Sequence, residues 1–181
     1  MKNLEWKAEL RDPNLARLIC KQINASFIAK IRQTDTYYNV ARGRLKKREA
    51  VAVERGIGSP EPVEYIFYER PDGVSARVSN YSIFTREQVE ERFGKAELPV
   101  WLTVTKAREL FMLDSVRIHI DDVHELGWHF EFEVLMNNDR DIETAPQRAE
   151  MIRATFLPAL GEPIQCSYSD LLEQHQSLQN Q

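Results

Sequence analysis

Charged side chains recur at two-residue spacing along this 181-residue chain, in a pattern that could bind metal and phosphate together. Glu131 and Glu133 lie two positions apart, so on an extended strand both carboxylates point to one side. Such a pair offers hard oxygen ligands to Mg²⁺ or Mn²⁺. Arg and Lys bind phosphate through forked bonds or as point charges. They share this spacing at Arg44, Lys46, Arg48, Lys106 and Arg108.

The elements that must position these residues are predicted to be amphipathic strands. Residues 128–134 carry aromatic side chains on the face opposite the two glutamates. Residues 116–121 place Arg117, His119 and Asp121 against an apolar face, and residues 3–10 group Glu5 with Lys7. We count roughly eight strands, and because most are joined by short turns they favour an antiparallel sheet.

Three or four helices are also expected. Asp12 and Pro13 predict the start of a helix that ends near residues 24–25. Thr85 and Gln88 form a capping box that opens a short helix. A third helix is predicted to open at residues 144–147, and a last one from Asp170, capped by Ser169.

A charged strand face is most often simply solvated. Two features weaken that interpretation here. The charges segregate by strand, and the opposite faces are apolar enough for the helices to cover them. If the sheet curls around its charged side, it encloses a cavity lined by both signs of charge. Burying such a lining is costly unless water, metal or a ligand fills it, so this pattern is typical of a functional site.

Composition excludes several classes of protein. Hydrophobic residues make up 43% and charged residues 29% of the chain, as in ordinary globular domains. The net charge of −4 argues against a nucleic-acid partner, and no apolar run is long enough to span a membrane. The first residues lack the apolar core of a signal peptide, and two cysteines make no disulfide framework. We therefore expect a cytoplasmic protein.

A set of motifs carries a family resemblance over residues 3 to about 172. In order they include residues 3–7, 35–38, 43–48, 68–72, 106–108, 116–121, 126–127, 131–133 and 167–172. The chain resembles the CYTH superfamily, also called triphosphate tunnel metalloenzymes, and is most similar to its class IV adenylyl cyclase group. The resemblance implies an α+β fold, an eight-stranded antiparallel β-barrel or tunnel with a charged interior and helices packed outside. We expect one domain over residues 1–176 and a frayed tail over 177–181.

The resemblance also implies roles for individual residues. It implies Mg²⁺ or Mn²⁺ held by Glu5, Asp121, Glu131 and Glu133, and catalytic roles for Lys7, Glu5 and Glu133. Phosphate-binding roles fall on Lys7, Arg44, Lys46, Arg48, Arg70, Arg77, Lys106, Arg108 and Arg117. The family signature opens Glu-x-Glu-x-Lys, but Asn3 replaces the first Glu here. An amide oxygen can still bind metal, so this change does not predict inactivation.

Two reactions fit the same residues. In a cyclase the 3′-hydroxyl of ATP attacks the α-phosphorus and pyrophosphate leaves. In a triphosphatase water attacks the terminal phosphorus of tripolyphosphate, thiamine triphosphate or a nucleotide. Subgroup similarity favours the cyclase, whereas Asn3 also leaves room for a non-catalytic polyphosphate- or nucleotide-binding module. His119 either lines the tunnel or makes a structural hydrogen bond. The resemblance is also compatible with a homodimer.

Overall fold

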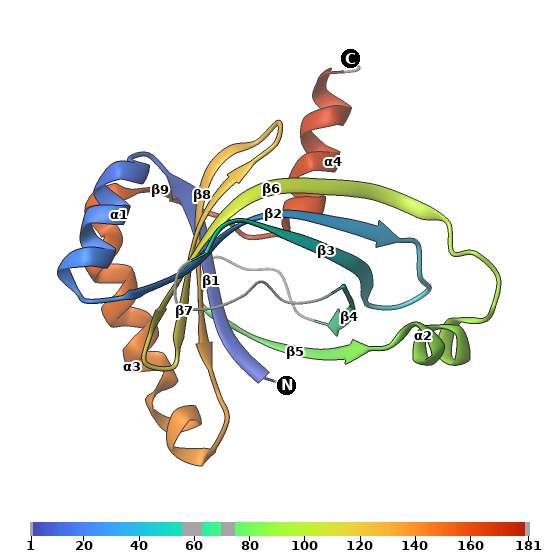
Figure 1. Ribbon diagram of the computed structural model, residues 1–181, viewed down its shortest axis with the longest axis horizontal. Coiled ribbons are helices and arrows are strands. Elements are labelled where there is room, and N and C mark those ends of the chain that lie inside the picture. The colour runs from blue at the N-terminus through green and yellow to red at the C-terminus, as the bar shows by residue number, and fades with distance from the viewer. Residues whose placement is uncertain (1, 56–62, 70–74, 180–181) are drawn as a thin grey trace.

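The chain folds into a closed β-barrel, shown in Figure 1. The computed structural model describes residues 2–55, 63–69 and 75–179. The strands of this part are β1 (Lys2–Leu10), β2 (Ser26–Tyr38), β3 (Arg44–Arg55), β4 (Glu64–Glu69), β5 (Arg77–Phe84), β6 (Val100–Leu113), β7 (Val116–Val123), β8 (Gly127–Leu135) and β9 (Leu160–Pro163). They form one antiparallel sheet in the order β5-β4-β3-β2-β6-β7-β8-β1-β9. Because β5 also pairs with β1, strands β1 to β8 close on themselves, which confirms the predicted eight-stranded tunnel.

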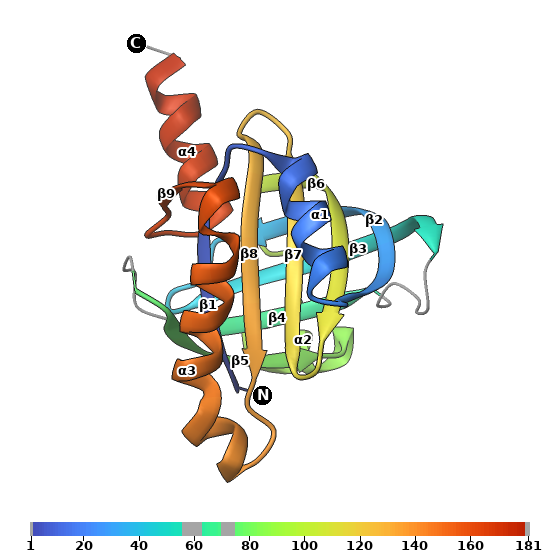
Figure 2. The same cartoon turned by 90° about the vertical axis from the view of Figure 1, so that its left-hand side faces the viewer.

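Helices lie outside this barrel. They are α1 (Pro13–Gln22), α2 (Arg86–Phe93), α3 (Asp139–Phe156) and α4 (Tyr168–Gln179), with the short 3₁₀ helix η1 (Leu157–Ala159) after α3. Figure 2 shows α1 and α3 against the outer surface formed by β1, β7 and β8. Among the described residues, no helix is long and apolar enough to span a membrane.

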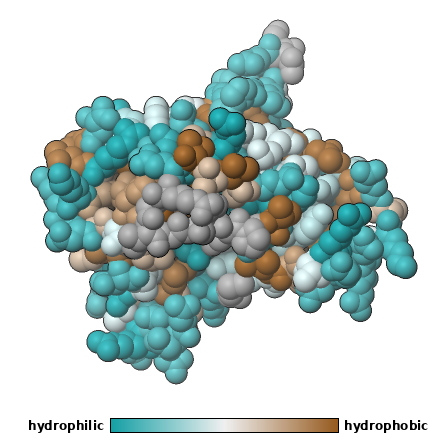
Figure 3. All heavy atoms as spheres, in the orientation of Figure 1, coloured by the Kyte–Doolittle hydropathy of each residue, from teal (hydrophilic) through white to brown (hydrophobic). Residues whose placement is uncertain are grey.

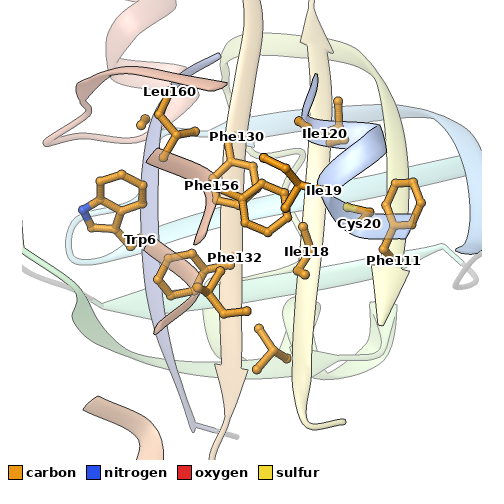
Figure 4. Packing of buried hydrophobic residues seen from close by; sticks show 14 of the residues in the cluster. Trp6, Ile19, Cys20, Phe111, Ile118, Ile120, Phe130, Phe132, Phe156 and Leu160 are labelled. Atoms are coloured by element: carbon orange, nitrogen blue, oxygen red, sulfur yellow. The ribbon is translucent and has the colours of Figure 1, made fainter. Parts of the chain in front are cut away.

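Strand β8 illustrates how the barrel wall separates an apolar outer face from a charged interior. Its alternate residues Phe130, Phe132 and Val134 are fully buried on the outer face, beneath the helices. Figure 4 shows Phe130, Phe132 and Phe156 of α3 packed together, with the rings of Phe130 and Phe156 4.5 Å apart. Each such side chain contributes about 2–3 kcal/mol through burial. The intervening residues Glu131 and Glu133 must therefore face the barrel interior.

A second cluster closes one end of the barrel. Tyr168 and Leu172 of α4 pack against Tyr37, Val104 and Val123, which belong to β2, β6 and β7. Figure 3 shows that α4 presents mostly hydrophilic side chains on the face in view. The helix therefore buries its first turns and places Tyr168, with Ser167 directly before it in the chain, at the end of the tunnel.

Local capping signals predicted some helix ends correctly. The Asp12 side chain accepts a hydrogen bond from the Leu15 amide at 2.9 Å, with Pro13 in the first turn of α1. The capping box at Thr85 and Gln88 opens α2 as predicted.

The starts of α3 and α4 differ from the prediction. Helix α3 begins at Asp139 rather than at residue 144, because Asn138 accepts from the Asp141 amide at 2.9 Å. The Thr144 hydroxyl instead donates to the Arg140 carbonyl within the helix. Helix α4 begins at Tyr168 and continues to Gln179, so residues 177–179 of the expected frayed tail are helical, and residues 180–181 lie outside the described part.

Candidate active site

Two cavities of about 150 and 200 Å³ lie inside the barrel. Arg48, Arg108, Arg117 and Glu133 line both of them, so the two cavities form one tunnel with a shared charged centre. One cavity extends from this centre toward Ser167 and Tyr168. The other extends toward the apolar side chains Ile28, Ala29, Ile31, Leu110 and Met112.

The antiparallel register brings charged residues of neighbouring strands face to face. On β1 and β8, Lys7 lies opposite Glu131 and Glu5 opposite Glu133. On β7 and β8, Arg117 lies opposite Glu133 and His119 opposite Glu131. Since residues directly opposite on one face have their Cβ atoms close together, Glu131 and Glu133 each meet a cation or an imidazole, whereas Glu5 and Glu133 form a like-charged pair.

Glu131 is a buried carboxylate of the tunnel that three basic side chains approach. One oxygen lies 3.7 Å from Lys7 Nζ, and the other accepts from Arg108 Nη2 at 2.7 Å and lies 3.6 Å from His119 Nδ1. Burial by itself would raise the pKa of Glu131, but the charges of Lys7 and Arg108 outweigh it and hold the pKa well below its usual range. The carboxylate is therefore ionised at neutral pH and available to a cation.

Glu131 belongs to a group of donor atoms that suits a metal ion. Ligand atoms of His119, Glu131 and Glu133 all lie within 4.8 Å of one another. Two predicted ligands thus lie together, while Glu5 lies opposite Glu133 and lines the tunnel outside this group. The Asn3 Oδ1 atom lines the same tunnel, is buried and has no hydrogen-bond partner in the described structure. These oxygen and nitrogen donors fit a divalent cation.

Asp121 was predicted as a further metal ligand, but the structure gives it a different environment. It is fully buried and receives two hydrogen bonds from Arg108, at 2.7 and 2.6 Å. Tyr168 donates to it at 3.0 Å, and Lys106 Nζ lies 3.3 Å away. Both oxygens are therefore engaged by protein groups, and this geometry favours a structural ion-pair role over metal binding.

Most of the predicted phosphate-binding residues converge on the tunnel. Those that line it are Lys7, Lys46, Arg48, Lys106, Arg108 and Arg117. Arg44 does not line either cavity and instead pairs with Asp170 of α4 at 2.7 Å. Arg77 lies opposite Glu5 in the register of β5 and β1. Arg70 lies outside the described residues.

Sequence reasoning assigned no role to Asp35 or Tyr168. Asp35 accepts from Lys46 at 2.7 Å and from Arg48 at 3.0 Å, and so holds both cations in the tunnel wall. The Tyr168 ring lies 3.9 Å from Lys7 Nζ and 4.8 Å from Lys106 Nζ, in cation–π contact with both. Alternation along β2 could have placed Asp35 inside, whereas no local signal predicts that α4 reaches the tunnel.

Lys106 tests whether the site keeps a buried cation for anion binding at a cost in stability. Burial and the neighbouring Arg108 lower the pKa of Lys106 to about 7, against 10.5 when unperturbed. Between pH 7 and 10.5 Lys106 is protonated in the unfolded chain but neutral in the folded one. Folding must then release this proton, so the free energy of unfolding rises with pH across this range. The cost of burying the lysine is therefore greatest at and below pH 7.

We therefore expect Lys106→Met to raise the free energy of unfolding at pH 7 by about 1 kcal/mol, because it removes a buried ammonium group while Asp121 keeps Arg108 as its partner. The gain should shrink toward pH 9, while tripolyphosphate binding weakens. Urea denaturation at pH 7 and 9, with calorimetric titration of tripolyphosphate, would check both effects. A less stable variant at pH 7 would show that the ion pair with Asp121 outweighs the cost of burying the ammonium group.

Comparison with known proteins agrees with this architecture. The CYTH domain family model matches residues 1–155, and the chain therefore belongs to the CYTH domain family. Members of this superfamily act on triphosphates as adenylyl cyclases or triphosphatases and depend on metal ions. The predicted family resemblance is thereby confirmed. A comparison with curated proteins found no match.

Solved structures of low sequence identity share the fold. A candidate adenylate cyclase from Vibrio parahaemolyticus is 15% identical, with a TM-score of 0.68 and coverage of 94% of this chain and 97% of that one. A protein from Pyrococcus horikoshii is 19% identical, with a TM-score of 0.65 and coverage of 95% and 98%. A Hippeastrum protein proposed to be an adenylyl cyclase, whose dominant activity is that of a triphosphatase, is 14% identical, with a TM-score of 0.52 and coverage of 92% and 91%.

Proposed function

We propose that the protein is a metal-dependent enzyme that binds ATP in the tunnel and converts it to cyclic AMP and pyrophosphate. The observation that carries this proposal is the apolar zone beside the charged centre. Ile31, Leu110 and Met112 line the tunnel next to Arg108 and its neighbours. A nucleoside triphosphate has the matching chemistry, since it joins several charged phosphates to an organic group with apolar faces.

The balance of charge explains why metal would be required. In the described structure six basic side chains and five carboxylates line the tunnel, and Asp121 lies directly behind them. A triphosphate adds several negative charges to this nearly neutral lining. Glu131 and Glu133 would hold a divalent cation that compensates them and stabilises charge on the phosphoryl oxygens and the leaving group.

The cations of the wall would orient the phosphates. Arg48, Arg108 and Arg117 lie at the shared centre of the two cavities and can donate hydrogen bonds to phosphate oxygens. Asp35 and Asp121 hold Arg48 and Arg108 through Nε and Nη2, so each of these two arginines would donate to phosphate through its Nη1 group. Lys7 would contribute a point charge from β1, and Glu5 and Glu133 would flank the reacting group. The 3′-hydroxyl would then lose its proton to one of these two carboxylates as its oxygen attacks the α-phosphorus, and the bond from that phosphorus to the departing pyrophosphate would break.

A triphosphatase is the second candidate. All six described cations that line the tunnel belong to one of its two cavities, and this set needs no organic group to bind three phosphates. The fold neighbour from Hippeastrum, whose dominant activity is that of a triphosphatase, supports this alternative.

Phosphorus NMR of the products tests these reactions directly. Protein would be incubated with ATP, and separately with tripolyphosphate, in Mg²⁺ or Mn²⁺, with EDTA-treated samples as the control. Cyclic AMP and pyrophosphate from ATP are the expected products. Orthophosphate released fastest from tripolyphosphate would favour the triphosphatase. Binding of both compounds without any product would instead indicate a non-catalytic module.

A further inference from the structure

The proposed metal site contains a buried imidazole whose role is not explained by protein contacts. His119 lies on β7 with 3% of its surface exposed, and its Nδ1 atom has no hydrogen-bond partner in the described structure. The register with β8 places the residue opposite Glu131. A buried polar atom without a partner is costly, so its retention points to a missing partner in the tunnel.

The distances around this atom fit a shared ion better than a hydrogen bond. Nδ1 lies 3.6 Å from the nearest Glu131 oxygen, which is too long for a hydrogen bond. Two ligands bonded to one ion at about 2.1 Å lie roughly 3 to 4 Å apart. The ligand atoms of His119, Glu131 and Glu133 already lie within 4.8 Å of one another, so small movements would bring all three onto one ion.

We propose that His119 is a third protein ligand of the metal ion and that its imidazole makes the site prefer Mn²⁺ to Mg²⁺. The inference rests on the proposed function, which places the ion at Glu131 and Glu133. Imidazole binds first-row transition metals well, whereas Mg²⁺ prefers an all-oxygen shell. A site of one nitrogen and two carboxylates therefore selects against Mg²⁺ while still accepting Mn²⁺ through its oxygens.

Neighbouring cations make this binding dependent on triphosphate. Arg108 and Lys7 approach the Glu131 carboxylate, and Arg117 lies 3.6 Å from a Glu133 oxygen. These charges oppose a metal ion that enters alone. Tripolyphosphate would supply alternative partners for Arg108, Lys7 and Arg117, so Mn²⁺ should bind more tightly when it is present.

The test measures Mn²⁺ binding by electron paramagnetic resonance, without relying on turnover. Wild-type protein would be titrated with Mn²⁺ with and without tripolyphosphate, and Mg²⁺ would be used as the competitor. Pulsed spectra of the bound ion are expected to show coupling to an imidazole nitrogen. His119→Leu should lower Mn²⁺ affinity roughly tenfold or more, since even indirect partners of a metal are worth 10- to 100-fold.

Two further variants test whether the imidazole nitrogen itself binds the ion. His119→Asn keeps an oxygen donor near the Nδ1 position, so it should lose the nitrogen coupling and narrow the preference for Mn²⁺ over Mg²⁺. His129→Gln is the matched control, because His129 is equally buried on β8 but directs Nδ1 to the Gly127 carbonyl at 2.9 Å. It should retain wild-type Mn²⁺ binding.

The outcomes separate this inference from the proposed function. Stoichiometric Mn²⁺ binding without nitrogen coupling, or unchanged selectivity in His119→Asn, would overturn the role of His119 while leaving a carboxylate metal site intact. If wild-type protein binds neither Mn²⁺ nor tripolyphosphate, the proposed function fails and the inference fails with it. Should His119→Leu not fold, the wild-type spectrum and His119→Asn still decide the question.

Discussion

The substitution Glu131→Gln is expected to remove metal-dependent turnover and leave the barrel folded. The variant keeps the shape of the side chain but removes the charge that a divalent cation needs. Arg108 would still be held by its two hydrogen bonds to Asp121, so the change does not leave that buried guanidinium without a partner. We expect turnover of ATP or tripolyphosphate to fall on the order of 10²-fold or more.

The measurement is phosphorus NMR of the products at saturating metal, alongside circular dichroism to verify the fold. Glu109→Gln is the matched control. Glu109 is as buried as Glu131, but it lies on the outer side of β6, where it pairs with Arg17 at 2.9 Å. Its substitution should leave turnover close to wild type. Full activity in Glu131→Gln would rule out this carboxylate as a metal ligand.

Asp121→Asn should cause the largest loss of stability among the tunnel variants. Burial would raise the pKa of Asp121, but Arg108 and Lys106 keep it far below its ordinary value, so the native state depends on the charge. Neutralising it would take from the buried Arg108 guanidinium, which cannot lose its proton, the charged carboxylate that accepts two of its hydrogen bonds. Breaking a buried ion pair from one side costs about 3 to 5 kcal/mol.

Urea denaturation would measure this loss, and thermal unfolding should show a midpoint roughly 6 to 20 °C lower. Asp122→Asn is the control, because the neighbouring Asp122 is exposed and should tolerate the change. The result also distinguishes the metal-ligand role predicted for Asp121 from its structural ion-pair role. A variant that keeps wild-type stability but loses metal affinity would restore the predicted ligand role and contradict the structural one.

Alternation along single strands determined much of this protein in advance. The pattern of residues 128–134 already separates Phe130 and Phe132 from Glu131 and Glu133, because a strand turns successive side chains to opposite faces. The same local rule placed Lys46 with Arg48, and Lys106 with Arg108, on one strand face each. Together with the order of the motifs, these faces predicted the tunnel fold. Capping at Asp12 and Thr85 is equally local and was predicted correctly.

The partner of each charge was decided only by the tertiary structure. His119 and Asp121 lie on the same face of β7, and no sequence pattern tells which one lies beside Glu131 and Glu133 and which one anchors an arginine. The closed sheet sets Asp121 opposite Arg108 and His119 opposite Glu131. The packing of α4 against the barrel brings Tyr168 to Asp121 and Lys7. Strand register and barrel closure are non-local, so the sequence determines which residues face inward, whereas the folded sheet determines which charges meet.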